Sequence, residues 1–221
     1  MRALVVLGGD TFGSDTWLAG LARHSDVVIA ADGGATHLDR AGRRPDVVVG
    51  DLDSLDDSAH VALERQGVAF EVHPHEKEQT DGELAIAAAV RRGADDITVA
   101  GAFGGARLDH LTANLLLLAH ADFAAIDIAL VTERATFRVL VGPGILELEG
   151  APGDWVSLEA LSETAAGATT DGLRYALRHE DLVRGSTRGV SNELTGPRGS
   201  VEVARGLLLV ATVTRRSVAS R

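Results

Sequence analysis

The chain has 221 residues, no cysteine, and 32 acidic against 21 basic side chains, for a net charge of −11. The lack of cysteine excludes disulfides, thiolate nucleophiles and zinc–thiolate sites, and the acidic balance argues against nucleic acid or an anionic membrane as a partner. Because no apolar run approaches about 18 residues, the sequence predicts a cytoplasmic protein that does not span a membrane.

Up to about residue 132, short apolar runs alternate with amphipathic segments, the pattern of an α/β domain with a mostly parallel sheet and flanking helices. The runs predict strands near 3–8, 26–31, 46–50, 68–73, 96–101 and 126–132. Helices are expected to begin at Ser14, near residue 35, at Asp56 or Asp57, at Thr80 and at about Leu108. The loops after the strands would then meet at one sheet edge, where open α/β sheets bind ligands.

The pattern changes after Gly142, where strand-like runs are separated by turn residues. Examples are Trp155–Leu158, Ser200–Val203 and Leu207–Val210. We therefore expect two domains, residues 1–141 and a smaller antiparallel β domain of residues 142–221. A sheet of this size should have little core of its own, which predicts that it packs on the first domain or on a second subunit.

Two aspartates, Asp51 and Asp53, follow the apolar run that ends at Gly50. Alternate residues of an extended segment point the same way, so both carboxylates would converge at the carboxyl end of a buried strand. Such carboxylates repel each other unless a cation lies between them, and an oxygen-only ligand set suits a magnesium ion that carries phosphates. The alternative is a turn that caps the next helix, with Ser54 and Asp57 as caps.

A third carboxylate and the chain's only lysine occur in the segment Glu76–Glu83. Thr80 and Glu83 have the spacing of a capping box, but capping does not explain Asp81 or Lys77. A metal–polyphosphate site needs an oxygen ligand for the ion and a point charge for phosphate. Asp81 and Lys77 are therefore candidates for the same site.

Two glycine turns are candidates for holding phosphate. Asp32 and Gly33 follow a predicted strand and would let backbone N–H groups approach a ligand, although an ordinary turn is the alternative. The segment Gly104–Asp109 leads into a helix N-terminus, with Arg107 placed to meet an anion. Neither a P-loop nor a dinucleotide-binding fingerprint is present.

These motifs occur in the order seen in thiamine pyrophosphokinases, and the resemblance covers essentially the whole chain. It is carried by Ala31–Ala35, Gly50–Ser54, Glu76–Asp81, Gly104–Asn114 and Gly185–Glu193. The resemblance implies a C-terminal β-sandwich, a homodimer, and Mg²⁺-dependent transfer of the diphosphoryl group of ATP to the hydroxyl of thiamine, with release of AMP. The chain departs from the family pattern at Ala106, which separates Gly105 from Arg107.

The resemblance also implies roles for individual residues. Magnesium would be held by Asp51, Asp53 and Asp81, which with Arg107 would form the catalytic set. The nucleotide would be bound by Asp32, Gly33, Lys77, Arg107 and Asp109. Thiamine would be contacted by Gln79, Thr80, Ser191 and Asn192. The polar segment 186–193 is too poor in apolar residues for a core strand, which favours ligand contact, with a solvated hairpin as the alternative.

Two other functions fit parts of this pattern. A diphosphokinase that acts on a pterin alcohol would need the same acidic cluster, but the loop containing Ser191 and Asn192 favours thiamine. A non-catalytic sensor of thiamine or nucleotide would not need a complete metal site, so the three aspartates and Lys77 argue for an enzyme.

Overall fold

The computed structural model describes residues 1–52, 57–105 and 107–215, and the chain divides into two compact units, Met1–Glu133 and Arg134–Arg221. In the first unit the strands are β1 (Arg2–Val6), β2 (Val27–Ala31), β3 (Val47–Gly50), β4 (Ala69–Val72), β5 (Asp96–Ala100) and β6 (Asp127–Val131). They pair in parallel in the order β6-β5-β1-β2-β3-β4. The expected parallel α/β sheet is confirmed.

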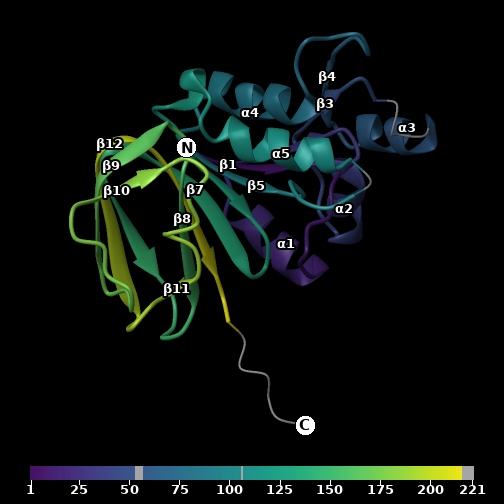
Figure 1. Ribbon diagram of the computed structural model, residues 1–221. Coiled ribbons are helices and arrows are strands. Elements are labelled where there is room, and N and C mark those ends of the chain that lie inside the picture. The colour runs from purple at the N-terminus through teal and green to yellow at the C-terminus, as the bar shows by residue number, and fades with distance from the viewer. Residues whose placement is uncertain (53–56, 106, 216–221) are drawn as a thin grey trace. The chain divides into compact units, whose positions relative to one another are not determined.

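The helices of the first unit are α1 (Asp15–Arg23), α2 (Gly34–Arg40), α3 (Asp57–Arg65), α4 (Asp81–Arg91) and α5 (Leu108–Leu117), with a short 3₁₀ helix, η1 (Ala121–Phe123). Figure 1 shows α4 and α5 on one side of the sheet and α1 and α2 on the other. Because both faces are covered, the central strands are apolar throughout, and Val5, Ile29 and Val48 are fully buried. No helix in the described ranges is long and apolar enough to cross a membrane.

Two helices begin where the sequence predicts. The Ser14 hydroxyl accepts a hydrogen bond from the backbone N–H of Trp17, and the Thr80 hydroxyl accepts one from Glu83. Each cap satisfies a backbone donor that has no partner inside its helix. The cap at Thr80 places α4, and with it Asp81, beside the ends of the strands.

The order of the strands creates a crevice beside β1. The chain passes from β1 through α1 to β2 on one side, whereas β5 lies on the other side and is reached through α4. The chain after β1 and the chain after β5 therefore lead to helices on opposite faces of the sheet (Figure 1). This is the topological switch point at which open α/β sheets bind ligands.

The second unit is an antiparallel β domain. Its strands are β7 (Ala135–Glu149), β8 (Trp155–Ala160), β9 (Thr164–Asp171), β10 (Glu180–Val183), β11 (Asn192–Glu193) and β12 (Arg198–Val213). β12 pairs with β7 along its length, with β9 through its first half and with β8 through its second half. Buried side chains such as Leu158, Leu177 and Leu208 form a core within this unit. The expectation of little core is therefore wrong, because the strands fold over one another rather than form one flat sheet.

The expected boundary at residues 141/142 lies inside β7, and the division between units falls after Glu133. The turn residues at 142–144 mark a β-bulge instead. Gly142 pairs with Gly206 and Gly144 pairs with Val203, so β12 carries an extra residue opposite Pro143. Proline has no N–H for the ladder, and a bulge accommodates it without ending the strand. For the same reason the runs at 200–203 and 207–210 are one bulged strand.

Candidate active site

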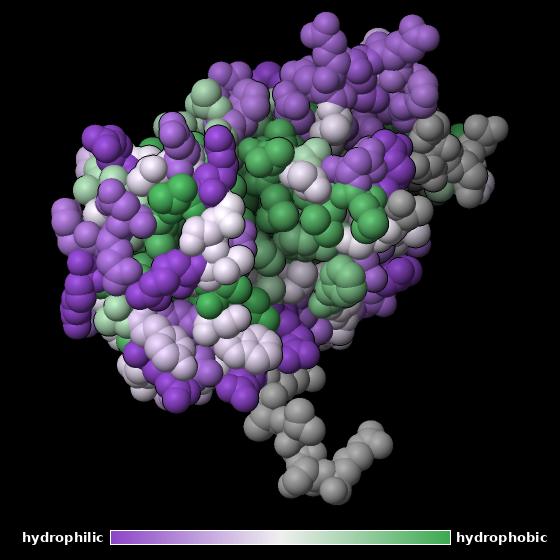
Figure 2. Space-filling model, in the orientation of Figure 1, coloured by the Kyte–Doolittle hydropathy of each residue, from purple (hydrophilic) through white to green (hydrophobic). Residues whose placement is uncertain are grey.

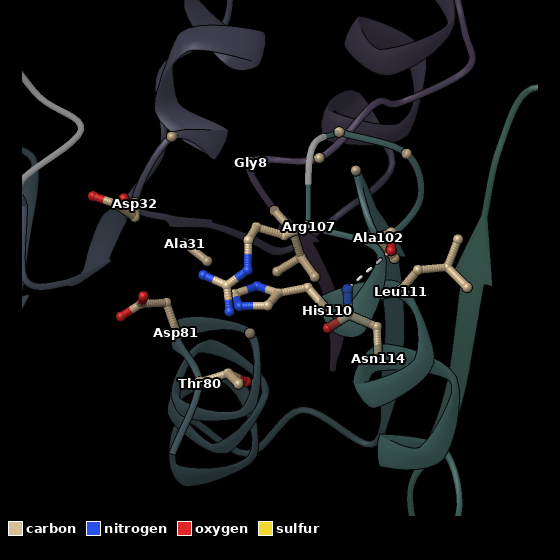
Figure 3. Close-up of a pocket in the computed structure, with 17 residues that line it drawn as sticks. Gly8, Ala31, Asp32, Thr80, Asp81, Ala102, Arg107, His110, Leu111 and Asn114 are labelled. Carbon is tan, nitrogen blue, oxygen red and sulfur yellow. Dashed lines mark hydrogen bonds between the residues drawn. The ribbon is translucent and has the colours of Figure 1, made fainter. Parts of the chain in front are cut away.

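A cavity of about 330 Å³ lies at the carboxyl ends of β1, β2 and β5, against the start of α4 and one face of α5 (Figure 3). Many of its lining residues are glycines, and the polar side chains among them come from three segments: the turn after β2, the start of α4, and α5 with its cap. The lining consists of Leu7, Gly8, Gly9, Ala31, Asp32, Gly33, Thr80, Asp81, Gly82, Gly101, Ala102, Gly104, Gly105, Arg107, His110, Leu111 and Asn114. The sequence therefore correctly predicts the sheet edge at which a pocket forms.

The glycines let two loops run in direct contact along the cavity. The backbone N–H of Gly9 donates to the Gly101 carbonyl at 2.9 Å, and that of Asp10 donates to Phe103 at 2.6 Å. Gly101 has φ +74°, and a Cβ at this position would lie 2.2 Å from the Leu7 carbonyl oxygen. Only glycine fits such a conformation and approach. Gly101 therefore lets the loops after β1 and β5 pack directly against each other.

Aspartates from two segments approach each other beside this cavity, next to Gly50 at the end of β3. A Cβ at Gly50 would lie 3.2 Å from Asp32 Cβ and 3.2 Å from Asp81 Oδ1. The glycine at the end of β3 thus leaves room for Asp32 from the end of β2 and Asp81 from the start of α4. Asp32 itself has φ +44°, and its backbone N–H donates to the Val49 carbonyl at 3.0 Å, which ties the turn after β2 to β3.

Lys77 lies between two of the predicted magnesium ligands. Its Nζ is 3.0 Å from Asp81 Oδ1 and 3.5 Å from Asp51 Oδ2, and its side chain is 12% exposed. Burial lowers the pKa of Lys77, but the Asp81 and Asp51 carboxylates outweigh burial and raise its pKa above the ordinary value. The lysine is therefore charged and shared by both carboxylates.

The contacts of Lys77 with Asp51 and Asp81 also show that these residues suit a magnesium ion. Asp51 and Asp81 present their oxygens to one cation, Lys77, which is the arrangement that a hard divalent ion also requires. Asp53 lies outside the described residues. Within the ranges that are described, no group of three or more acidic or histidine side chains is placed to hold a metal. The donor chemistry fits the ion, with Asp51 and Asp81 as the described part of the set.

Arg107 lines the cavity, and its guanidinium forms a two-pronged ion pair with Asp109. The Nε–Oδ1 distance is 2.9 Å and the Nη2–Oδ2 distance is 2.6 Å. The hydrogen bond from Arg107 lowers the pKa of Asp109 to about 2, so this carboxyl stays ionised at any pH well above that value. Figure 3 shows the Arg107 side chain pointing toward the side where Asp32 and Asp81 lie. Ala106 lies outside the described residues.

The residues expected to contact thiamine have different surroundings. Thr80 lines the cavity but uses its hydroxyl as the α4 cap, as the capping alternative predicts, and Gln79 is exposed. Ser191, in the second unit, is exposed and has φ +63°. Its backbone N–H donates to the Ser157 hydroxyl at 3.2 Å.

Asn192 is buried, and its side-chain amide is used within the fold. Its Oδ1 accepts from Tyr175 N–H at 2.9 Å, and its Nδ2 donates to the Tyr175 carbonyl at 2.7 Å. A buried amide must satisfy its hydrogen bonds, and these two bonds tie the segment around Tyr175 to β11. The structure therefore gives Asn192 a structural role that the sequence pattern did not reveal.

Two further polar residues shape the cavity and were not assigned from the sequence. Asn114 Nδ2 donates to the Ala102 carbonyl at 2.9 Å, and His37 Nε2 lies 2.7 Å from the Gly9 carbonyl oxygen. His37 must donate through Nε2, because a carbonyl only accepts. Asn114 ends one of the motifs that carry the family resemblance, so a signal existed for it, whereas nothing local distinguishes His37 from any helical histidine.

Comparison with known proteins identifies the family of this chain. Residues 18–130 match the model of the thiamin pyrophosphokinase catalytic domain, and residues 145–208 match that of the thiamin pyrophosphokinase vitamin B1 binding domain. A thiamine pyrophosphokinase from Bacillus subtilis is 29% identical over 215 residues, which span 97% of this chain and 100% of that protein.

Solved structures give the same result. The crystal structure of thiamine pyrophosphokinase from Bacillus subtilis has a TM-score of 0.84 and 28% identity, over 97% of this chain and 99% of that one. The thiamin pyrophosphokinase from Geobacillus thermodenitrificans has a TM-score of 0.82 and 32% identity, over 98% of this chain and 99% of that one. These matches do not favour a pterin diphosphokinase or a sensor, and the chain belongs to the thiamin pyrophosphokinase family.

Proposed function

We propose that the protein transfers the diphosphoryl group of ATP to the hydroxyl of thiamine, with Mg²⁺ bound, and releases thiamine diphosphate and AMP. The observation that carries this proposal is the convergence of Asp51 and Asp81 on one cationic group beside a glycine-lined cavity at the switch point of the sheet. Transfer of this kind depends on positioning and charge neutralisation more than on a covalent intermediate.

Each part of the site has a role in this proposal. Asp51, Asp53 and Asp81 hold the magnesium ion, which when bound would neutralise the polyphosphate and draw charge from the group under attack. Gly33 leaves space for the nucleotide beside Asp32, and Arg107 supplies a fixed positive charge to the phosphates. The ion pair with Arg107 supports a role for Asp109 in orienting that guanidinium. Gln79 and Ser191 are exposed and available to thiamine.

The reaction products test this proposal. Enzyme mixed with ATP, Mg²⁺ and thiamine should yield AMP and thiamine diphosphate in equal amounts, without accumulation of ADP. EDTA should stop the reaction, because unscreened carboxylates repel the polyphosphate. Chromatography of the nucleotides and thiamine esters measures both products. ADP with thiamine monophosphate would mean that the terminal phosphorus is attacked, and AMP release with a hydroxymethylpterin alone would identify a different acceptor.

We also propose that the protein is a homodimer. Exposed apolar surface on α5 supports a dimer. The small size of the second unit does not, because that unit has a core of its own. Leu108 and Leu116 of α5 are 71% and 56% exposed, and Figure 2 shows a hydrophobic area over this helix. Exposed apolar patches of this kind mark interaction sites. Light scattering after size exclusion should give twice the 23.0 kDa chain mass at micromolar concentration, and a monomer over that range would contradict the proposal.

A further inference from the structure

Lys77 contacts the oxygens that the proposed function gives to magnesium. Its Nζ lies 3.0 Å from Asp81 Oδ1 and 3.5 Å from Asp51 Oδ2. We infer that Lys77 and the divalent cation compete for these two carboxylates, so that binding of the ion releases the lysine toward the phosphates. This inference rests on the proposed function, and it explains how one lysine can pair with the carboxylates and also serve the nucleotide.

The position of Lys77 has no explanation in the stability of α4. The lysine precedes the Thr80 cap, and a positive charge near a helix N-terminus is disfavoured by the helix dipole. Its side chain is also only 12% exposed, so a long, flexible group is ordered at a cost in rotamer entropy. Contact with Asp51 and Asp81 offsets both effects. The two carboxylates therefore hold Lys77 in place, and its ammonium supplies the positive charge that they need.

Simultaneous occupation of this position by Lys77 and a metal ion is unfavourable. Mg²⁺ binds oxygen ligands at about 2.0–2.1 Å, so it would lie closer to the same oxygens than the ammonium does. Two cations so close together, where Lys77 and Asp51 are each 12% exposed, repel strongly because little water screens them. A lysine suits this exchange because its ammonium is a compact charge on a flexible stem, whereas an arginine fork prefers a fixed paired geometry.

Among the contacts that the described residues make, His75 is a second basic group beside Asp51. Its Nδ1 is 2.8 Å from Asp51 Oδ2, but its side chain is 81% exposed. Water screens a group that is so open, and the ring can turn away without leaving a buried charge. Lys77 is therefore the main competitor of the divalent cation for the two carboxylates. Its removal should change the affinity for the cation and the affinity for the nucleotide in opposite directions. The free cation should bind more tightly without it, and the nucleotide more weakly.

Isothermal titration with Mn²⁺, without nucleotide, tests the first effect in the wild type, Lys77→Met and Lys77→Gln. Both variants should lower the dissociation constant for Mn²⁺ by about tenfold, since the ion no longer displaces a charge. Arg23→Met, which removes one positive charge from the exposed end of α1, is the matched control and should stay within about twofold of the wild type. ATP titrated at saturating Mn²⁺ should bind both Lys77 variants about tenfold more weakly.

Because Lys77 is the only lysine, the wild type offers a test that needs no substitution. Protein labelled with ¹⁵N-lysine should show one side-chain signal, and Mg²⁺ should shift it saturably as the ammonium leaves the carboxylates. The same titration of Asp81→Asn should leave the signal unmoved. This readout applies even if the Lys77 variants fold poorly, which circular dichroism would reveal.

The outcomes separate the two ideas. If Asp81→Asn abolishes Mn²⁺ binding but the Lys77 variants bind Mn²⁺ no more tightly than the wild type, the metal ligands stand and the competition is refuted. A lysine signal that stays fixed while Mg²⁺ binds would refute it as well. If Asp81→Asn binds Mn²⁺ as the wild type does, the metal assignment fails, and the competition fails with it.

Discussion

Asp81→Asn is expected to lower kcat about 10²–10³-fold at saturating thiamine and ATP while leaving the fold intact. The substitution keeps the size of the side chain but removes a charge that contacts Lys77 at 3.0 Å and that we assign to magnesium. Asp81 packs in no apolar core, and its loss from the first turn of α4 should change the free energy of unfolding by about 1 kcal/mol or less. A coupled assay of AMP release and circular dichroism measure the two effects.

Glu83→Gln is the matched control for that experiment. Glu83 lies in the same first turn of α4 and carries the same charge, but it does not line the cavity. Its substitution should leave kcat within about threefold of the wild type, since a charge outside the site is screened by solvent. Near-normal turnover of Asp81→Asn at saturating Mg²⁺ would remove Asp81 from the catalytic set.

Gly101→Ala is expected to lower the free energy of unfolding by about 3 kcal/mol or more, through backbone strain and overpacking together. Gly101 has φ +74°, and an added Cβ would lie 2.2 Å from the Leu7 carbonyl oxygen. Backbone atoms cannot move aside as a flexible side chain does, so the loops after β1 and β5 must separate. Urea denaturation measures the loss, and the KM for ATP should rise because these loops line the cavity.

Gly93→Ala separates the two causes of that loss. Gly93 also has a positive φ, +89°, but nothing lies within 4 Å of an added Cβ. It should therefore lose only the strain of the left-handed conformation, about 1–2 kcal/mol, and leave the KM for ATP unchanged. Equal losses in the two variants would show that the contact with Leu7 is relieved at little cost.

Several features of the fold followed from the sequence because their causes are local. Apolar runs such as 46–50 predict buried parallel strands, and the oxygen side chains of Ser14 and Thr80 predict helix starts, since a cap needs only its own N–H neighbours. When strands and helices alternate, the strands are parallel, and their carboxyl ends all lie at the same edge of the sheet. The place of the cavity therefore followed from the order of the elements.

Other features depended on partners far apart in the chain. The turn residues at 142–144 indicated a domain boundary. In the structure β7 continues through these residues, because it pairs with β12 on both sides of the bulge. The family resemblance predicts that Asn192 contacts thiamine, and nothing in the sequence indicated that its side-chain amide also bonds to the backbone of Tyr175. Local pattern cannot tell a polar group that meets a substrate from one that satisfies a distant backbone.

The sequence by itself thus determined the family and the class of fold, and it predicted which acidic residues would form the site. Only the tertiary structure decided that Lys77 lies between Asp51 and Asp81, that Arg107 pairs with Asp109, and that His37 contacts the loop at Gly9. The physical reason is that secondary structure follows from short-range periodicity and capping. Partners of charged side chains are set by distances between segments, which exist only after the chain has folded.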